Sequence, residues 1–200
     1  MSKWDKATKT PVVRALGIDC STKSLAYACF EGDKPLYCGE ITFEGANVFA
    51  RLKDARVKTQ ALLDSSDIMG TDGFRADYVA IEAAIAVKNV KTAILLAYVY
   101  GAVMSVLMQN GAEVVEVPPI TWQSFIGNPN LKTAEKAKLR ADNPGKSASW
   151  YQNAGRLMRK QRTLTFARDY FTIESGSDNI GDAVGVAYYA ANKLTRQNAE

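Results

Sequence analysis

The sequence predicts an α/β fold in which helices flank a mixed β-sheet. Two stretches, residues 12–19 and 78–81, are almost continuously apolar, as is typical of strands buried on both faces of a sheet. The first stretch opens a run of three strand-like segments, 13–19, 24–31 and 35–43, whose short connecting turns favour an antiparallel meander. After this meander, segments with helical period alternate with strand-like segments, which indicates an α/β architecture.

The remaining elements follow from hydrophobic periodicity and from the residues that end helices and strands. Val48, Leu52, Ala55 and Leu62 recur near the helical period and predict a helix at 46–64. The other predicted elements are a strand at 77–82, a helix at 89–109, a strand at 113–117, a short helix at 121–126, basic helices at 132–141 and 147–171, and a last helix at 179–194. A chain of 200 residues that is 47% hydrophobic suits a single domain covering residues 1–200.

Acidic residues stand at the ends of these apolar elements. Asp19 ends the first strand and Glu82 ends the strand at 77–82, so their carboxylates meet at one sheet edge if the two strands are parallel neighbours. Asp178 and Asp182 are four residues apart and share one face of the last helix. Carboxylates brought this close repel one another unless a cation lies between them, and Mg²⁺ prefers such oxygen ligands.

The chain contains no histidine, the commonest general base and zinc ligand. Carboxylate–metal chemistry is therefore the natural way for this protein to activate a water molecule. The three cysteines, Cys20, Cys29 and Cys38, have no metal-binding spacing, and we expect reduced thiols packed in or near strands, as in an intracellular protein.

A strongly basic segment covers residues 131–168. It holds ten lysines and arginines against two acids, so it carries +8 while the rest of the chain carries −4. Trp150, Tyr151 and Phe166 lie between these charges, as base-stacking side chains do, and the segment predicts a polyanionic partner. The alternative is an ordinary solvated helix face.

The apolar run at 94–108 is 15 residues long, shorter than the roughly 20 that a membrane span needs, and we expect a buried helix and no membrane partner. The helix at 89–109 is apolar nearly all round, so both of its sides need cover. We expect one side to pack on the sheet and the other on a second copy of the chain. The alternative is burial under the C-terminal helices of the same chain.

Four motifs, taken in order and spacing, resemble the RuvC family of Holliday junction resolvases, which has a ribonuclease H-like fold. They are LGIDCSTKSLAYA (Leu16–Ala28), AIEAAIAVKN (Ala80–Asn89), VPPITWQSFIG (Val117–Gly127) and DNIGDAVGVA (Asp178–Ala187). The resemblance spans nearly the whole chain and points to a phage-encoded branch. It implies a five-stranded sheet in which a three-stranded antiparallel meander is joined by two parallel strands, and a cytoplasmic protein of a bacterial or phage-infected cell.

The resemblance also implies a function: a metal-dependent, structure-selective DNA endonuclease that acts as a homodimer and resolves four-way junctions or related branched DNA by paired symmetric nicks. In the family, two Mg²⁺ or Mn²⁺ ions are held by four acidic positions, which here map onto Asp19, Glu82, Asp182 and Asp178. The fourth position is open, because bacterial members commonly place it where this chain has Asn179, and Asp178 also suits a helix N-cap.

Basic and apolar residues complete the expected site. Lys160 matches a catalytic basic position of the family, and a surface lysine is its alternative. Ile85 stands where the family has an aromatic residue that splays bases. The expected DNA-binding residues are Lys146, Arg156, Arg159, Lys160, Arg162 and Ile85.

Three other functions compete with this interpretation. A nuclease of the same fold could act on other branched DNA or on RNA–DNA hybrids. A non-enzymatic binding module would leave the acids without a purpose. An actin-like kinase also carries a strand ending in Gly-Ile-Asp, yet that architecture needs a second domain of similar size.

Overall fold

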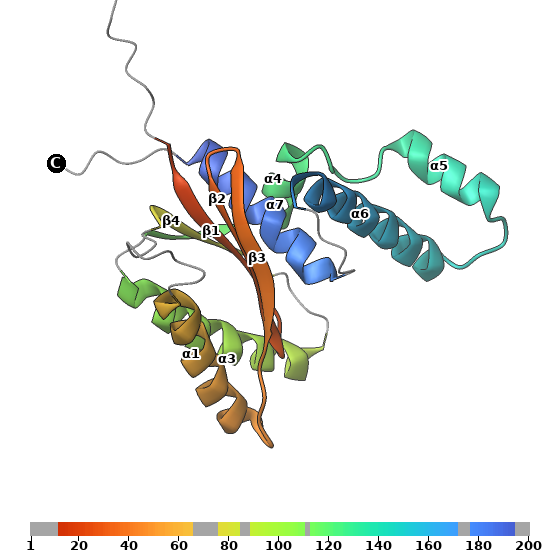
Figure 1. Cartoon of the computed structure of the whole chain (residues 1–200). Helices are drawn as coiled ribbons and strands as arrows, with labels where there is room; N and C mark the ends of the chain where they lie inside the picture. The colour runs from red at the N-terminus through yellow and green to blue at the C-terminus, as the bar shows by residue number, and fades with distance from the viewer. Residues whose placement is uncertain (1–11, 66–75, 85–88, 111–112, 172–176, 195–200) are drawn as a thin grey trace, which may run out of the picture.

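The computed structural model describes residues 12–65, 76–84, 89–110, 113–171 and 177–194. Its core is one five-stranded sheet with the strand order β3-β2-β1-β4-β5 (Figure 1). The strands are β1 (Arg14–Cys20), β2 (Ser24–Glu31), β3 (Lys34–Thr42), β4 (Tyr78–Glu82) and β5 (Glu113–Val117). The first three form the predicted antiparallel meander, and β4 lies parallel to both β1 and β5. The predicted mixed sheet is confirmed.

The helices also follow the predicted order, with bounds that differ by one or two residues. They are α1 (Val48–Asp64), α3 (Val90–Leu107) continued by the 3₁₀ turn η1 (Met108–Asn110), α4 (Pro119–Phe125), α5 (Thr133–Asp142), α6 (Ala148–Tyr170) and α7 (Asp178–Lys193). Both Thr121 and the prolines before it could start the short helix α4, and the structure begins it at Pro119, because proline suits the first helical position, where no backbone N–H donor is needed.

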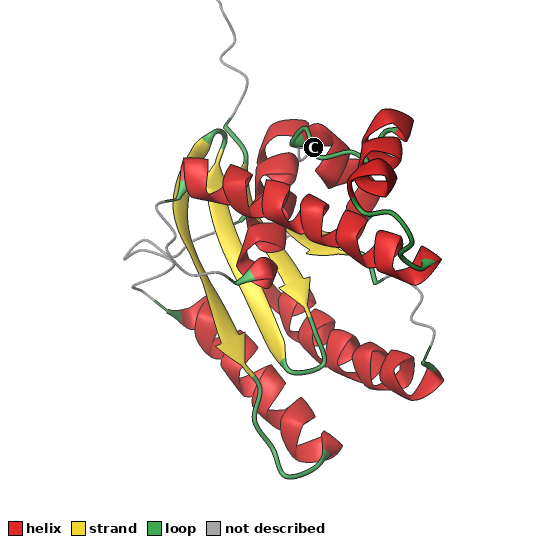
Figure 2. Ribbon diagram, turned by 90° about the vertical axis from the view of Figure 1, so that its right-hand side faces the viewer, coloured by secondary structure: helices red, strands yellow, loops and turns green. Residues whose placement is uncertain are grey.

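Helices cover the two faces of the sheet differently. On one face of the sheet lie α1 and α3 (Figures 1 and 2). These helices pack over large side chains such as Leu16, Ile18 and Ile81. On the other face, α7 packs over small side chains such as Ala15 and Ala80. The helices α4 and α6 then pack on α7. Side chains alternate between the faces along each strand, so the residues that point toward α7 are fixed by the register of the sheet.

Gly17 in β1 allows α7 to lie directly on the sheet. A Cβ atom at this position would lie 2.3 Å from the backbone nitrogen of Ala187 in α7. Only glycine permits this approach, and Gly17 precedes Asp19 on the same face of the strand. The close packing therefore brings α7, with its acidic residues, over the end of β1.

The helix α3 is buried on one side only. Val99, Val103 and Leu107 belong to the core shared with α1 and the sheet, whereas Ile94 and Tyr98 are 46% and 52% exposed. By length and composition alone this 18-residue helix could cross a membrane, and 22% of it is buried, on the side that packs against α1 and the sheet. The alternative in which the C-terminal helices cover α3 is wrong, because α6 and α7 lie on the opposite face of the sheet (Figure 1).

The three cysteines lie in β1, β2 and β3 and are free thiols, as expected. Cys29 is buried, and Cys20 and Cys38 are partly buried. Burial, together with the charge of the neighbouring Asp19, raises the pKa of Cys20 to about 12, which makes this thiol a poor nucleophile.

Candidate active site

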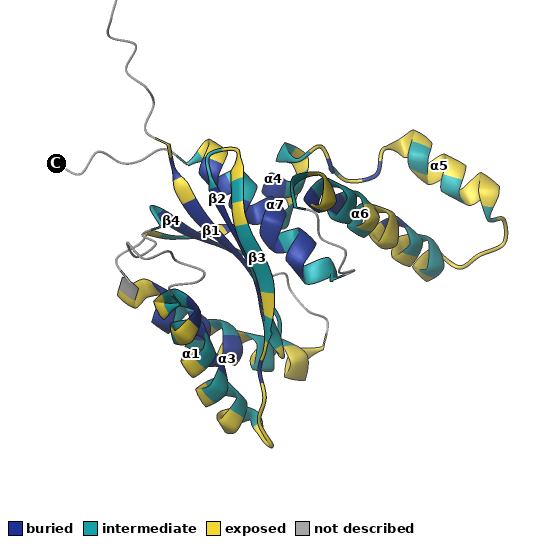
Figure 3. Cartoon of the chain, viewed as in Figure 1, coloured by how far each residue is buried: buried dark blue, intermediate teal, exposed yellow. Residues whose placement is uncertain are grey.

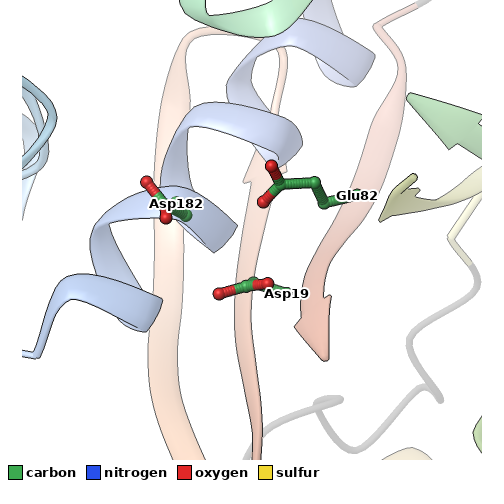
Figure 4. A group of neighbouring side chains, drawn as sticks. All are labelled: Asp19, Glu82 and Asp182. Atoms are coloured by element: carbon green, nitrogen blue, oxygen red, sulfur yellow. The ribbon is translucent and has the colours of Figure 1, made fainter. Parts of the chain in front are cut away.

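Three carboxylates from three separate elements converge on the face of the sheet covered by α7. Asp19 lies near the end of β1 and Glu82 ends β4, and the preceding residues of these parallel strands, Ile18 and Ile81, are paired. Asp182 comes from the second turn of α7. One oxygen from each carboxylate lies within 4.8 Å of the others (Figure 4). The convergence expected from the strand-end pattern is therefore present.

The environment of these carboxylates disfavours their charged forms. Burial raises the pKa of Asp19 to about 6, that of Asp182 to about 7 and that of Glu82 to about 8. Repulsion from Asp19 adds to the effect at Asp182 and Glu82. Lys160 opposes the shift at Asp19 and Asp182 without cancelling it. Three desolvated oxygen ligands that lack a matching positive charge suit a hard divalent cation such as Mg²⁺ or Mn²⁺. The donor set fits the predicted metal.

Asp178, the candidate for the fourth acidic position, has different contacts from the other three acids. Asp178 lies in the first turn of α7 and forms an ion pair with Lys160 of α6, outside the group of three carboxylates. The side-chain amide of Asn179 points elsewhere and donates a hydrogen bond of 2.7 Å to Glu40. The structure thus places Asp178 beside the site but against a lysine, and its role as a metal ligand stays a prediction.

Glu40 in β3 is a residue near the site that the sequence analysis missed. In the sheet register, Asp19 pairs with Ala26 and Ala26 pairs with Glu40, so Glu40 lies on the same face as Asp19 two strands away. Ser177 and Asn179 hold its carboxylate with hydrogen bonds of 2.6 and 2.7 Å. Its charge helps to raise the pKa of Asp19. Finding Glu40 requires the register of the meander, which strand periodicity alone does not supply.

A cleft of about 480 Å³ opens beside the carboxylates. Glu82 and Asp182 line one part of it, and Arg156, Arg159 and Lys160 of α6 line another. The helix α6 is therefore the part of the basic segment that lies beside the carboxylates. Positive charge beside a carboxylate site is the arrangement expected where phosphate groups are bound.

The other expected DNA-binding residues lie farther along the helices. Arg162 forms an ion pair with Glu135 of α5. Lys146 lies just before α6, with its ammonium 5.7 Å from the centre of the Trp150 ring. Ile85 lies outside the described residues. The DNA contacts of all these residues stay predictions.

Trp122 of α4 explains how the VPPITW motif supports the site. Its side chain is fully buried against α7, where a Cβ atom on Gly185 would lie 2.4 Å from the indole ring. Interaction with Trp122 lowers the pKa of Glu82, against the effect of burial. Trp122 thus joins α4, α7 and the end of β4 in one packed unit.

Comparison with known proteins adds similarity at the level of structure. No protein-family model matches the chain, and no curated protein sequence matches it. Among solved structures, Thermus thermophilus RuvC in complex with a Holliday junction substrate aligns with a TM-score of 0.62 at 13% identity, over 92% of this chain and 99% of that one. A second T. thermophilus RuvC structure aligns with a TM-score of 0.55 at 14% identity, over 89% and 95% of the two chains.

A third solved structure, the yeast mitochondrial Holliday junction resolvase Ydc2, has a TM-score of 0.47 at 12% identity, over 90% of this chain and 78% of that one. The similarity to RuvC, together with the strand order, establishes a RuvC-like, ribonuclease H-like α/β fold. The predicted fold is confirmed.

Proposed function

We propose that this protein is a metal-dependent endonuclease that cuts branched DNA and resolves four-way junctions. The observation that carries the proposal is the convergence of Asp19, Glu82 and Asp182 beside a cleft lined by Arg156, Arg159 and Lys160. Carboxylates hold metal ions, and the basic side chains hold phosphates. The shared fold supports the choice of substrate, since T. thermophilus RuvC is described in complex with a Holliday junction.

The residues in and beside the cleft would each have a separate part in the reaction. Asp19, Glu82 and Asp182 would hold two Mg²⁺ or Mn²⁺ ions, with Asp178 as a fourth ligand. When bound, such ions supply a nucleophile at neutral pH and offset the charge that develops on the phosphate. The ammonium of Lys160 would stabilise the same developing charge, and Arg156 and Arg159 would orient the strand. A chain without histidine performs this reaction with no imidazole base.

The exposed face of α3 supports the proposal of a homodimer. Val90, Ile94, Tyr98 and Gly101 follow one another at helical spacing and are all exposed. A Cβ atom on Gly101 would meet nothing within 4 Å in the described part of the chain, so a second helix has room to approach closely. A two-fold dimer presents two active sites, which two symmetric nicks require.

A nicking assay tests the proposed function directly. The purified protein is incubated with Mg²⁺ or Mn²⁺ and with four substrates: a synthetic four-way junction, a branched fork, linear duplex DNA and an RNA–DNA hybrid. We expect metal-dependent, symmetric nicks in the junction. Cleavage of the hybrid or the fork in preference to the junction would assign the protein to the alternative nuclease class. Failure to cut any substrate would refute an enzymatic function.

A further inference from the structure

A second cavity, about 460 Å³ in volume, lies between α5 and α6. It shares Asn130, Arg156 and Arg159 with the cleft beside the carboxylates. The two cavities therefore adjoin at these residues, and the second one lies farther along α6 from the candidate active site. We call this second cavity, between α5 and α6, the hairpin groove.

Positive charges line the hairpin groove, and none of its lining residues is acidic. Lys136 and Arg140 face it from α5, one helical turn apart, and Arg156 and Arg159 face it from α6. Within the described residues, Lys136, Arg140 and Arg156 form no ion pair. By contrast, Arg162 just outside the groove is paired with Glu135. The cations without an ion-pair partner therefore line the groove. Arg162, which has a partner, connects α6 to α5.

The hairpin that forms this groove is held at both ends. At its base, Glu135 accepts a 2.7 Å hydrogen bond from the backbone N–H of Lys132 and also pairs with Arg162 of α6. Leu131 packs there against Gly155, where a Cβ atom would lie 2.9 Å from the leucine side chain. At its tip, the Tyr151 hydroxyl donates a hydrogen bond to the carbonyl of Asn143. The groove is therefore formed before any ligand binds.

The helix α5 adds little to the stability of the core. None of its residues is buried, and it projects from the body of the protein together with the N-terminal half of α6 (Figures 1 and 3). A helix without a buried face gains almost nothing from the hydrophobic effect. Its polar attachments to α6 instead fix Lys136 and Arg140 opposite Arg156. Electrostatic recognition of a polyanion accounts for this arrangement.

We infer that the hairpin groove binds the sugar–phosphate backbone of the DNA strand that runs away from the cleavage site. This inference rests on the proposed nuclease function. From Lys160 to Ala148, α6 extends about 18 Å at 1.5 Å per residue, which matches about five phosphates at 3.4 Å spacing in one strand of a duplex. The groove thus holds one junction arm and sets its direction relative to the carboxylates.

Binding measurements on a matched pair of variants test the groove. The double variant Lys136→Ala/Arg140→Ala removes two cations that line it, and Lys132→Ala/Lys138→Ala removes two cations of the same segment that do not. Both are made in an Asp19→Asn background so that DNA remains uncut, and circular dichroism melting verifies that each folds. Junction affinity is measured by fluorescence anisotropy over a range of salt concentrations.

We expect the groove variant to lose at least about tenfold in affinity and about two units of log–log salt slope, and the control to lose clearly less. A second arm uses a junction whose nearest phosphates on one side of the cleavage site, about five of them, are neutral methylphosphonates. The protein without the groove substitutions should bind this modified junction less tightly than the unmodified one. The groove variant should bind the modified junction with nearly the same affinity as that protein, because the phosphate contact that its substitutions remove is already absent. Additive losses, or equal losses in the two variants, would overturn the inference.

The outcomes separate the groove from the proposed function. If the wild-type protein cuts junctions and the groove variant binds like the control, the groove is refuted and the nuclease stands. A different outcome is that the wild-type protein cuts no substrate, while the groove variant still binds DNA less tightly than the control. That outcome would support the DNA-binding role of the groove and refute the nuclease function. A loss of affinity for double-stranded RNA without a loss for DNA would assign the groove to RNA and refute the inference.

Discussion

Lys160 of α6 forms an ion pair with Asp178 in the first turn of α7. This pair joins the basic helix to the helix that carries Asp182. It also holds the ammonium where its charge partly offsets the rise in the pKa values of Asp19 and Asp182. A cation is thereby held beside the carboxylates before substrate arrives, which is the position needed to stabilise charge on a bound phosphate.

The carboxylate triad is expected to be essential for cleavage. Asp19→Asn, Glu82→Gln and Asp182→Asn should each lower the single-turnover nicking rate at least about 100-fold, because a lost metal ligand removes several kcal/mol of transition-state stabilisation. Junction binding should survive or strengthen, since an amide removes negative charge near the phosphates. Full nicking activity in any of these variants would contradict the assignment of that residue.

Lys160 is expected to act on the chemical step more than on binding. Lys160→Ala should lower the cleavage rate of bound junction about tenfold or more, because one positioned cation is lost from the transition state. Single-turnover rates are compared with anisotropy affinities, and Lys138→Ala, an exposed lysine of α5, is the control. An effect on affinity alone would mean that Lys160 is an ordinary phosphate contact.

The fourth acidic position can be located by metal binding. Asp178→Asn should weaken Mn²⁺ affinity because a carboxylate ligand is lost, and Glu40→Gln should weaken it about tenfold because a negative charge close to Asp19 is lost. Affinity is measured by titration with electron paramagnetic resonance detection, which needs no substrate. Glu113→Gln, an exposed acid at the opposite end of the parallel strands, is the control. Unchanged affinity in Glu40→Gln would exclude Glu40 from the metal site.

Without metal, the protein should lose stability as pH rises. The pKa values of Asp19, Asp182 and Glu82 in the folded state lie near 6, 7 and 8, above the ordinary values of 3.8 and 4.5. The unfolded chain therefore releases these protons first, so stability present near pH 4 is lost progressively up to about pH 8. Thermal melting in EDTA should show this decline, and Mg²⁺ should reverse it at high pH.

Asp19→Asn supplies the control for this pH dependence. It should raise the melting temperature of the metal-free protein by a few degrees at pH 8, at roughly 2–4 °C per kcal/mol, and change it little at pH 4. An equal shift at both pH values would show that the charge of Asp19 is not the cause.

The exposed face of α3 makes the dimer testable with two kinds of substitution. Ile94→Asp and Tyr98→Asp should produce monomers in sedimentation equilibrium and should uncouple the paired nicks. Gly101→Ala should stabilise the isolated helix by up to about 1 kcal/mol, yet it should weaken the dimer if a second helix packs there. Leu36→Asp, at an exposed position of the edge strand β3, should leave the dimer intact. A wild-type monomer on junction DNA would refute the dimer.

The sequence alone was sufficient to predict the order of helices and strands and to identify the three carboxylates that converge in the site. Burial on both faces makes β1 and β4 continuous apolar runs, so Asp19 and Glu82 stand out where these runs end. The helical spacing of Asp178 and Asp182 is equally local. Such features depend on neighbours within a few residues, and periodicity reveals them.

Only the tertiary structure decided which distant residues meet. Glu40 reaches the neighbourhood of Asp19 through the register of two antiparallel pairings, and Asp178 turns to Lys160 because α6 packs beside α7. The apolar face of α3 is exposed because the C-terminal helices pack on the other side of the sheet. On that side, the missing side chain of Gly17 allows α7 to pack closely on β1. These choices depend on long-range packing, which a local hydrophobic pattern does not specify.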